Sequence, residues 1–244
     1  TNKDHIIKHK KEKGEFYFFK TPSKKINTQD LLEEHIPELL GKIQWKKSMR
    51  WGNFELNWAR PLKSILASFD NKNLNFKFHH LTSSNMTFIN KEFEEKKKIF
   101  KNFKTYKNFF LKSKVIIDHN QRRKIIEKEF IKISKRKNII IESNDKLLEE
   151  VVNLTDKPNI LICKFEERFL EIPEEILIIT MQHHQKYFPT FNSKGNINNE
   201  FIVVANNEDI NGLIKVGNER VVNARLSDAE FFWSKNKSQN LVKQ

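Results

Sequence analysis

The chain has 244 residues, which is enough for one large or two small domains with a buried core. Its single cysteine, Cys163, excludes internal disulfides and favours a reducing compartment, so we expect a cytoplasmic protein. No apolar run is long enough to cross a membrane, and we find no signal-peptide pattern.

The charge balance is strongly basic, with 45 lysines and arginines against 31 aspartates and glutamates and a net charge of +14. Two explanations stay open. A polyanion such as RNA would suit this excess of positive charge. An AT-rich genome would also produce it, because only 8 of the 45 basic residues are arginine while asparagine, isoleucine and phenylalanine are abundant.

The N-terminal part predicts short strands and one helix. Residues 15–19 are aromatic and predict a strand, which the segment 21–23 ends. Asp30 is placed to cap a helix that begins at Leu31, and Pro37 should bend or restart that helix. An apolar run follows at 62–69, and the alternating segment 74–78 predicts a half-buried strand.

A loop at residues 46–52 carries the cations Lys47 and Arg50 between Trp45 and Trp51. The cations could hold phosphate while the indole rings stack on a base. Alternatively, the tryptophans pack in the core and the cations face solvent. The residues alone leave both interpretations open.

The middle of the chain predicts helices that alternate with short strands. Residues 106–111 should be helical, 115–117 should form a strand, and Asp118 should cap a long helix over 119–136. Four cations on that helix are typical of a solvated face: Arg122, Arg123, Lys124 and Lys128. Further elements follow: a strand at 138–141, a helix capped by Asp145, and a buried strand at 159–165.

Residues 164–188 organise the C-terminal half and predict a strand end, a turn, a short helix and a new strand. Pro173 suits the first position of that helix, where its missing N–H costs nothing. The segment 192–196 is a strong turn signal and should join strands at 187–191 and 201–205 into an antiparallel hairpin.

A final helix is expected from Gly212 to about Ser234. Its apolar residues form one stripe at helical spacing, which should be buried: Val222, Leu226, Ala229 and Trp233. Arg220 and Arg225 lie off this stripe. They are five positions apart, about 140° around the helix axis, so they cannot share one narrow line.

Three segments of the chain carry a family pattern. One lies at 47–52 and is followed by the pair 60–61. Another lies at 217–232, and the longest lies between them. The central one has the form F-x-x-x-F-L-x-x-P-x-E-x-L and then M-x-x-x-Q-K-Y-F, carried by Phe165, Phe169, Leu170, Pro173, Glu175, Leu177, Met181, Gln185, Lys186, Tyr187 and Phe188. In this order they resemble the β subunit of bacterial two-subunit glycyl-tRNA synthetase, from about Gly14 to Trp233. The chain departs from that family at 87–93, where the glycine and histidine of a T-x-G-H-R-F type segment are missing.

The resemblance implies an internal fragment, so that residues 1–244 are part of the N-terminal and central α+β region of the β subunit. It implies a possible sub-boundary near the helical segment 97–145. It also implies a module similar to the editing-domain-like part of the phenylalanyl-tRNA synthetase β subunit. The pattern of elements itself favours an α+β fold with mixed or antiparallel strands and about five helices, because strands and helices do not alternate strictly.

The resemblance further implies a part of glycine–tRNA ligase, which uses ATP to join glycine to tRNA(Gly) and releases AMP and diphosphate. In that α2β2 family the α subunit performs adenylation with ATP and Mg, while the β subunit contributes tRNA binding and assembly. We therefore expect no catalytic residue, cofactor or metal ligand in this fragment. Its partners would be the α subunit, tRNA(Gly) and the remainder of the β subunit. Two alternatives stay open, an assembly scaffold without RNA contact and a vestigial hydrolytic proofreading domain.

We expect Arg50, Arg220 and Arg225 to face the RNA, with Lys47 and Lys186 behind them. Arginine is scarce here, so composition drift explains an arginine less easily than a lysine. Its planar fork matches phosphate and stacks on bases. The alternative for the arginines on the last helix is an ion pair with a nearby carboxylate that holds the helix to its neighbours.

Overall fold

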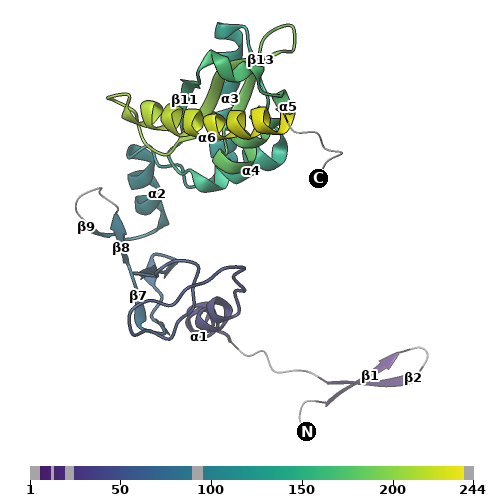
Figure 1. The fold of residues 1–244 in the computed structure, drawn as a ribbon. Helices are drawn as coiled ribbons and strands as arrows, with labels where there is room; N and C mark the ends of the chain where they lie inside the picture. Colours follow the sequence, from purple (N-terminus) through teal and green to yellow (C-terminus); the bar gives the residue numbers. More distant parts are fainter. Residues whose placement is uncertain (1–5, 12–13, 20–24, 90–95, 239–244) are drawn as a thin grey trace. The chain divides into compact units, whose positions relative to one another are not determined.

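The computed structural model describes residues 6–11, 14–19, 25–89 and 96–238. The chain divides into two compact units, 1–106 and 107–244, and the division lies inside the range 97–145. The described residues contain six α-helices and several small, mostly antiparallel sheets, so the expected α+β class is confirmed with one helix more than expected (Figure 1).

The first unit begins with an antiparallel hairpin of β1 (Ile6–Lys11) and β2 (Gly14–Phe19), which pairs Ile6 with Phe19. The strand predicted at 15–19 is confirmed. Every residue of β2 is exposed, although the strand is rich in aromatic side chains. The segment 21–23, expected to end the strand, lies outside the described residues.

Helix α1 (Thr28–Gly41) shows that the predicted cap was wrong. Asn27 is the N-cap, and its side-chain oxygen accepts a hydrogen bond from the backbone N–H of Gln29 at 3.1 Å. Asp30 lies in the first turn instead, where its charge suits the positive end of the helix. Pro37 lies inside a continuous helix, so the helix does not restart there.

The rest of the first unit is a set of short strands around a small core. Leu74, Phe76 and Phe78 are buried and alternate with exposed residues as predicted, but only Lys77–Phe78 of the predicted strand at 74–78 is a strand. The Ser83 hydroxyl holds this segment, because it donates to the carbonyl oxygen of Leu74 at 2.7 Å. Strand β3 runs parallel to β7, and the other pairs are antiparallel. The elements are β3 (Ile65–Leu66), β4 (Ser68–Phe69), β5 (Lys72–Asn73), β6 (Lys77–Phe78), β7 (Leu81–Ser84), β8 (Met86–Ile89), β9 (Lys96–Ile99) and the helix α2 (Phe103–Lys112), whose last residues belong to the second unit.

The second unit is built on a four-stranded antiparallel sheet in the order β10-β12-β13-β11. Its strands are β10 (Ile140–Ile141), β11 (Asn159–Lys164), β12 (Phe188–Phe191) and β13 (Ile197–Ala205). Alternation along β13 sends Phe201 and Val203 to one face of the sheet and Ile202 and Val204 to the other. Each face therefore supports its own hydrophobic core.

Helices cover both faces of this sheet (Figure 1). One core packs Ile202 against α3 (His119–Lys137) and α4 (Asp145–Leu154). The other packs Phe201 against α6 (Leu213–Ser238) and the central segment. That segment consists of the 3-10 turn η2 (Glu167–Glu171), the short helix α5 (Glu174–Ile179) and the π-helical turn η3 (Thr180–His184). The predicted order of strand end, turn, short helix and new strand is confirmed.

Capping residues were predicted correctly for one helix and wrongly for the next. Asp118 caps α3 by accepting from the N–H groups of Asn120 and Gln121. Asn144, not Asp145, caps α4 and accepts from Leu147 N–H at 2.7 Å. Neighbouring Asx residues are equally good caps in sequence, and only the backbone path shows which one precedes the first helical turn.

The strand predicted at 115–117 is absent from the structure. The Ile116 N–H donates to the Asp156 carbonyl at 2.7 Å, and the Ile116 carbonyl accepts from the Arg122 guanidinium at 2.7 Å. Its backbone groups are therefore satisfied without a neighbouring strand. The predicted hairpin is confirmed, because β12 pairs with β13 across the turn at 192–196.

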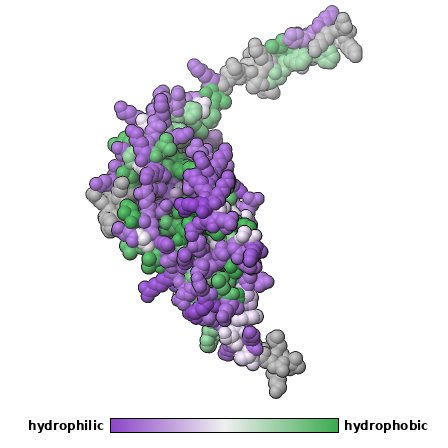
Figure 2. Space-filling view, turned by 90° about the horizontal axis from the view of Figure 1, so that it is seen from above, coloured by the Kyte–Doolittle hydropathy of each residue, from purple (hydrophilic) through white to green (hydrophobic). Residues whose placement is uncertain are grey.

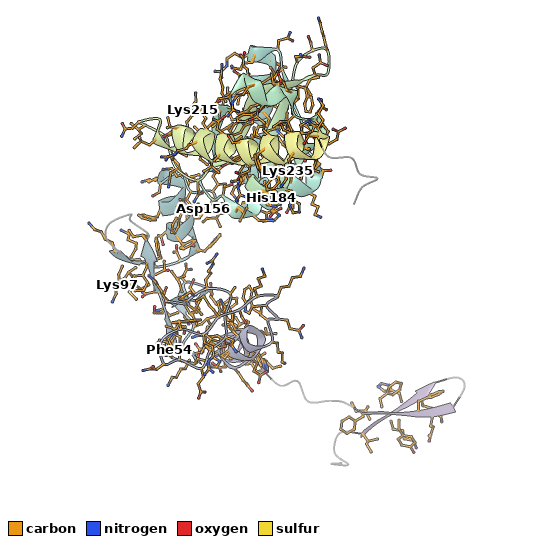
Figure 3. The ribbon with its side chains drawn as sticks, in the orientation of Figure 1. Phe54, Lys97, Asp156, His184, Lys215 and Lys235 are labelled. Atoms are coloured by element: carbon orange, nitrogen blue, oxygen red, sulfur yellow. The ribbon has the colours of Figure 1, made fainter. Side chains whose placement is uncertain are left out.

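Helix α6 begins near the predicted position and extends to Ser238. Val222 and Leu226 are fully buried, and Ala229 packs at the edge of the same core. Trp233 is only half-buried, so the end of the predicted stripe leaves the core. Lys215 and Lys235 mark the two ends of this helix (Figure 3).

Candidate nucleic-acid interface

Helix α6 positions Arg220 and Arg225 through contacts made by its inner face. Glu219 accepts the backbone N–H of Lys164 at 2.9 Å, and Asn223 accepts that of Glu166 at 2.9 Å. These bonds hold the helix against the end of β11. The rotation that buries Val222 and Leu226 leaves both arginines exposed.

Neither arginine has an ion pair within the part of the chain that the structure describes. The carboxylate of Glu219, a possible partner in sequence, already binds the Lys164 N–H and lies 3.9 Å from the Lys215 ammonium. Among the described residues, these arginines therefore do not form the alternative ion pair that would anchor the helix to its neighbours. Both guanidinium groups are free to meet an external anion.

Lys186 has a partner inside the protein. Its ammonium lies 3.0 Å from the Glu150 carboxylate on α4, and its backbone has a φ of 61° at the end of the π-helical turn. This pair competes with an external phosphate, so Lys186 is a weaker candidate than the arginines of α6. The neighbouring Tyr187 is buried and its hydroxyl donates to Asn218 on α6, while burial raises the pKa of its phenol. Tyr187 thus faces the core.

Lys47 and Arg50 lie on an exposed loop of the first unit. A backbone bridge between Met49 and Trp58 holds this loop, with N···O distances of 2.9 and 3.2 Å. Both cations are exposed and make no ion pair among the described residues. The predicted set therefore lies on two units, with Lys47 and Arg50 on the first and Lys186, Arg220 and Arg225 on the second.

The tryptophans beside the loop pack against other rings. Trp45 meets Trp58 edge to face at a centroid distance of 4.9 Å, and Trp51 meets His80 at 5.9 Å. Phe54 stacks on His80 at 3.8 Å. In this loop the tryptophans pack against other rings and the cations face solvent, as the second interpretation predicts. Trp45 nevertheless keeps 39% of its surface exposed.

The segment that departs from the family pattern begins on β8 and continues into residues outside the described part. Thr87 lies 3.1 Å from the Ser64 hydroxyl and borders a hollow of about 400 Å³ with Ser68, Phe103 and Tyr106. Burial raises the pKa of the Tyr106 phenol. These groups supply hydroxyls but no imidazole or carboxylate that could act as a general base.

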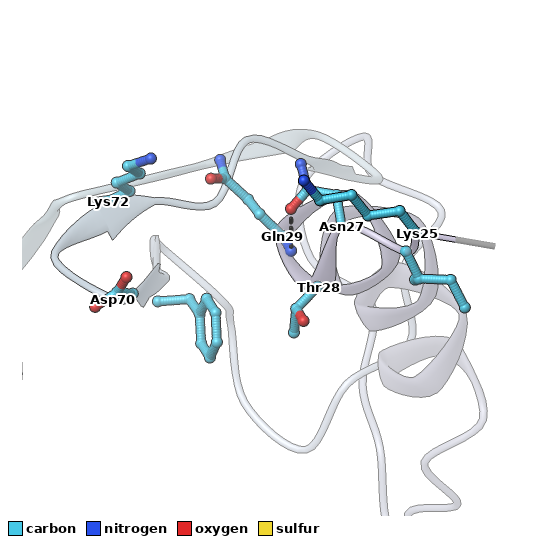
Figure 4. A pocket seen from close by; sticks show the side chains of 8 residues that line it. Lys25, Asn27, Thr28, Gln29, Asp70 and Lys72 are labelled. Atoms are coloured by element: carbon cyan, nitrogen blue, oxygen red, sulfur yellow. Dashed lines mark hydrogen bonds between the residues drawn. The ribbon is translucent and has the colours of Figure 1, made fainter. Parts of the chain in front are cut away.

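A second hollow of about 550 Å³ lies at the start of α1, beside the β4–β5 turn (Figure 4). Lys25 and Lys72 border it, together with the carboxylate of Asp70. The Gln29 amide in this hollow donates to Glu33 at 2.9 Å and to the Asn73 carbonyl at 3.3 Å. The polar groups of this hollow thus bind the first turn of α1 and the β4–β5 turn, and we assign no ligand to the hollow.

Chemistry other than anion binding has little support among the described residues. Those residues contain no cluster of histidine, cysteine, aspartate and glutamate suited to a metal ion. Burial raises the pKa of the Cys163 thiol to about 12, which makes it unreactive. No helix in the described ranges is long and apolar enough to span a bilayer.

Sequence reasoning missed a difference among the cations of α3. Arg122 donates to the carbonyls of Val152 and Ile116, and Arg123 binds three carboxylates, so neither belongs to a merely solvated face. Lys124 and Lys128 are exposed, as expected. Glu127 lies on α3 itself, but Asp145, Glu149 and the two carbonyls lie outside it, and helical spacing within α3 does not show them.

The chain is similar throughout its length to a known family. Residues 1–244 match the model of the glycyl-tRNA synthetase beta subunit family. Among curated proteins, the glycine–tRNA ligase beta subunit of Rickettsia akari is 37% identical over 227 residues, which cover 93% of this chain and 34% of the relative. The beta subunit of Rickettsia africae is 38% identical over 218 residues, 89% of this chain and 33% of the relative. The chain therefore spans about a third of the length of these relatives.

Proposed function

The chain belongs to the glycyl-tRNA synthetase beta subunit family, and on this premise we propose that it is the part of glycine–tRNA ligase that contributes tRNA binding and assembly. The complete α2β2 enzyme would join glycine to tRNA(Gly), with ATP and Mg used on the α subunit. This part would carry no catalytic residue of its own, and the enzyme would act in the cytoplasm.

The observation that carries the proposal is the pair of exposed arginines on α6, which form no ion pair with any residue that the structure describes. The inner face of this helix is tied to the sheet, so their positions are defined by the core rather than by a loose loop. Arg220 and Arg225 point in different directions around the helix, which suits two phosphates on either side of it. Arg50 and Lys47 extend the set on the first unit, and Lys186 supports it once Glu150 is displaced.

The test uses the reconstituted α–β enzyme with full-length β subunit. Arg50→Ala and Arg220→Ala should each weaken tRNA(Gly) binding and flatten the dependence of log K on log salt by about one unit, because each removes one phosphate contact. Lys194→Ala, on the turn between β12 and β13, is the matched control for loss of one exposed charge. Unchanged tRNA affinity and aminoacylation in both arginine variants would overturn the RNA-facing set.

A separate experiment tests the division of labour. The chain alone should show no glycine-dependent exchange of pyrophosphate into ATP, since adenylation is proposed to lie on the α subunit. Addition of the α subunit should restore a signal. Exchange by the chain alone, above that of a blank, would contradict this assignment.

An assembly scaffold without RNA contact is the second candidate, and one feature of α6 favours it. Leu213, Phe231 and Phe232 are 71%, 63% and 59% exposed on this helix, and apolar residues are visible among hydrophilic ones on the surface of the molecule (Figure 2). Such residues suit a protein interface better than RNA. Phe231→Ser with Phe232→Ser should then weaken association with the α subunit, and the unaltered chain should show no specific tRNA binding of its own.

We also propose that the second unit corresponds to the editing-domain-like module of the phenylalanyl-tRNA synthetase β subunit. Its support is the antiparallel sheet with helices on both faces. Proofreading activity is a weaker candidate, because the segment after Thr87 lacks the family's glycine and histidine. Hydrolysis of mischarged tRNA(Gly) by the chain, at a rate above spontaneous deacylation, would support it.

A further inference from the structure

Helix α3 carries two kinds of cation, and they differ in what they contact. The cations near the sheet and α4 are engaged inside the protein: Arg123 binds Glu127 at 3.0 Å, and Lys137 binds Glu200 at 2.7 Å. Lys124, Lys128 and Lys135 are exposed and have no ion pair within the described residues. These three residues are called the lysine stripe below.

The lysine stripe is a line along the helix. Positions 124, 128 and 135 fall within about 40° around the helix axis and extend over about 16 Å along it. The opposite side of α3 is fixed, because Ile126, Phe130 and Ile133 are buried in the core against the sheet. The stripe therefore points away from the core.

The carboxylates of α3 do not neutralise the stripe. Glu127 and Glu129 are the only acidic residues of this helix, and they bind Arg123 at 3.0 Å and Lys132 at 2.5 Å. Lys124 and Lys128 are four positions apart, a spacing at which like charges destabilise a helix. A row of unpaired like charges has this cost in the free chain, and a bound polyanion would remove it.

We propose that the lysine stripe of α3 is a second RNA-contacting surface, which binds the phosphate backbone without reading sequence. The inference rests on the proposed role in tRNA binding and adds residues that the arginine set does not contain. A membrane surface fits less well, because the apolar face that an interfacial helix needs is already buried in the core. A line of point charges suits a regularly charged backbone, and lysine serves as such a point charge.

The test measures binding of tRNA(Gly) and of a non-cognate tRNA to this chain across a salt series. The stripe variant K124Q/K128Q/K135Q is compared with a control, K146Q/K194Q/K235Q, which removes the same charge from exposed lysines on other elements. The stripe variant should weaken both tRNAs alike, by on the order of tenfold at low salt, and flatten the salt slope by about two to three units. Thermal unfolding of both variants should match that of the wild type, which separates lost contacts from lost folding.

Each outcome is decisive. Equal affinities and slopes for the stripe and control variants would overturn the stripe while leaving the proposed function intact, provided that R220Q/R225Q weakens binding. A wild-type chain that binds neither tRNA would overturn both. A stripe variant that loses the α subunit and keeps tRNA would show that the partner is an acidic protein surface, which also overturns the proposal.

Discussion

Two antiparallel hairpins of this chain both contain phenylalanines but have opposite surroundings. The hairpin β1–β2 is rich in aromatic residues, and Phe16, Tyr17 and Phe18 are 44%, 68% and 47% exposed. In β12–β13, Phe188, Phe201 and Ile202 are fully buried between two layers of helices. Aromatic content therefore predicted a strand in both places, but burial depended on which elements cover each face.

Amide hydrogen exchange should show the largest difference between the hairpins. A two-stranded hairpin alone is at best marginally stable in water, whereas central strands of a core open only with global unfolding. Amides of β13 should therefore exchange at least about 1,000-fold more slowly than those of β1 and β2. Comparable protection in both hairpins would show that β1–β2 is covered in solution.

Truncation of one phenylalanine in each hairpin tests the energetic side. Phe201 has no exposed surface and stacks on Tyr187 at a centroid distance of 5.2 Å, so Phe201→Ala should cost about 3–5 kcal/mol of unfolding free energy. Phe16→Ala is the matched control and should cost well under 1 kcal/mol. Urea unfolding followed by circular dichroism measures both. A large effect of Phe16→Ala would contradict the exposed placement.

Helix α6 offers the same contrast within one element. Leu226→Ala should cost about 2–5 kcal/mol because Leu226 is fully buried. Trp233 is half-buried, so Trp233→Ala should cost only about 1–2 kcal/mol, less than its place in the apolar stripe suggests. Denaturation midpoints of the two variants provide the check. A Trp233→Ala penalty equal to that of Leu226→Ala would mean that the stripe is buried to its end.

A paired glutamate in each hairpin gives a smaller contrast, because only that of Glu200 on β13 should depend on pH. Burial raises the pKa of Glu200 on β13, but the ammonium groups of Lys137 and Lys164, at 2.7 and 3.3 Å, outweigh it and leave that pKa below its ordinary 4.5. A carboxyl with a lowered pKa in the folded state stabilises the fold above the unfolded pKa, and this stability disappears as the pH falls through the folded pKa.

Glu200→Gln should therefore cost about 1–2 kcal/mol near neutral pH and have a smaller effect below about pH 4. Glu15→Gln removes the exposed pair with Lys8 on β1 and should leave stability essentially unchanged at any pH. Unfolding curves between pH 3 and pH 7 distinguish the two. A pH-independent penalty for Glu200→Gln would show that its charge is not what stabilises β13.

Local signals in the sequence were enough for several parts of this protein. The turn at 192–196, the span of α3 from its Asp118 cap, and the buried face of α6 near Val222 follow from turn chemistry and helical period, which act over a few residues. The family also follows from the sequence, because its motifs are read residue by residue.

Only the tertiary structure decided features that depend on distant groups. The partner of Lys186 is Glu150 on another helix, and the exposure of Trp233 depends on where the core ends. The segment 115–117 forms no strand, since Asp156 and Arg122 bind the backbone of Ile116. On α3, Arg122 and Lys137 differ from the lysine stripe because Val152 and Glu200, on other elements, bind them. The charge pattern and the hydrophobic periodicity of a sequence show on which side of its own helix or strand a residue lies. The distant groups that the residue contacts lie on other elements, which meet only when the chain folds.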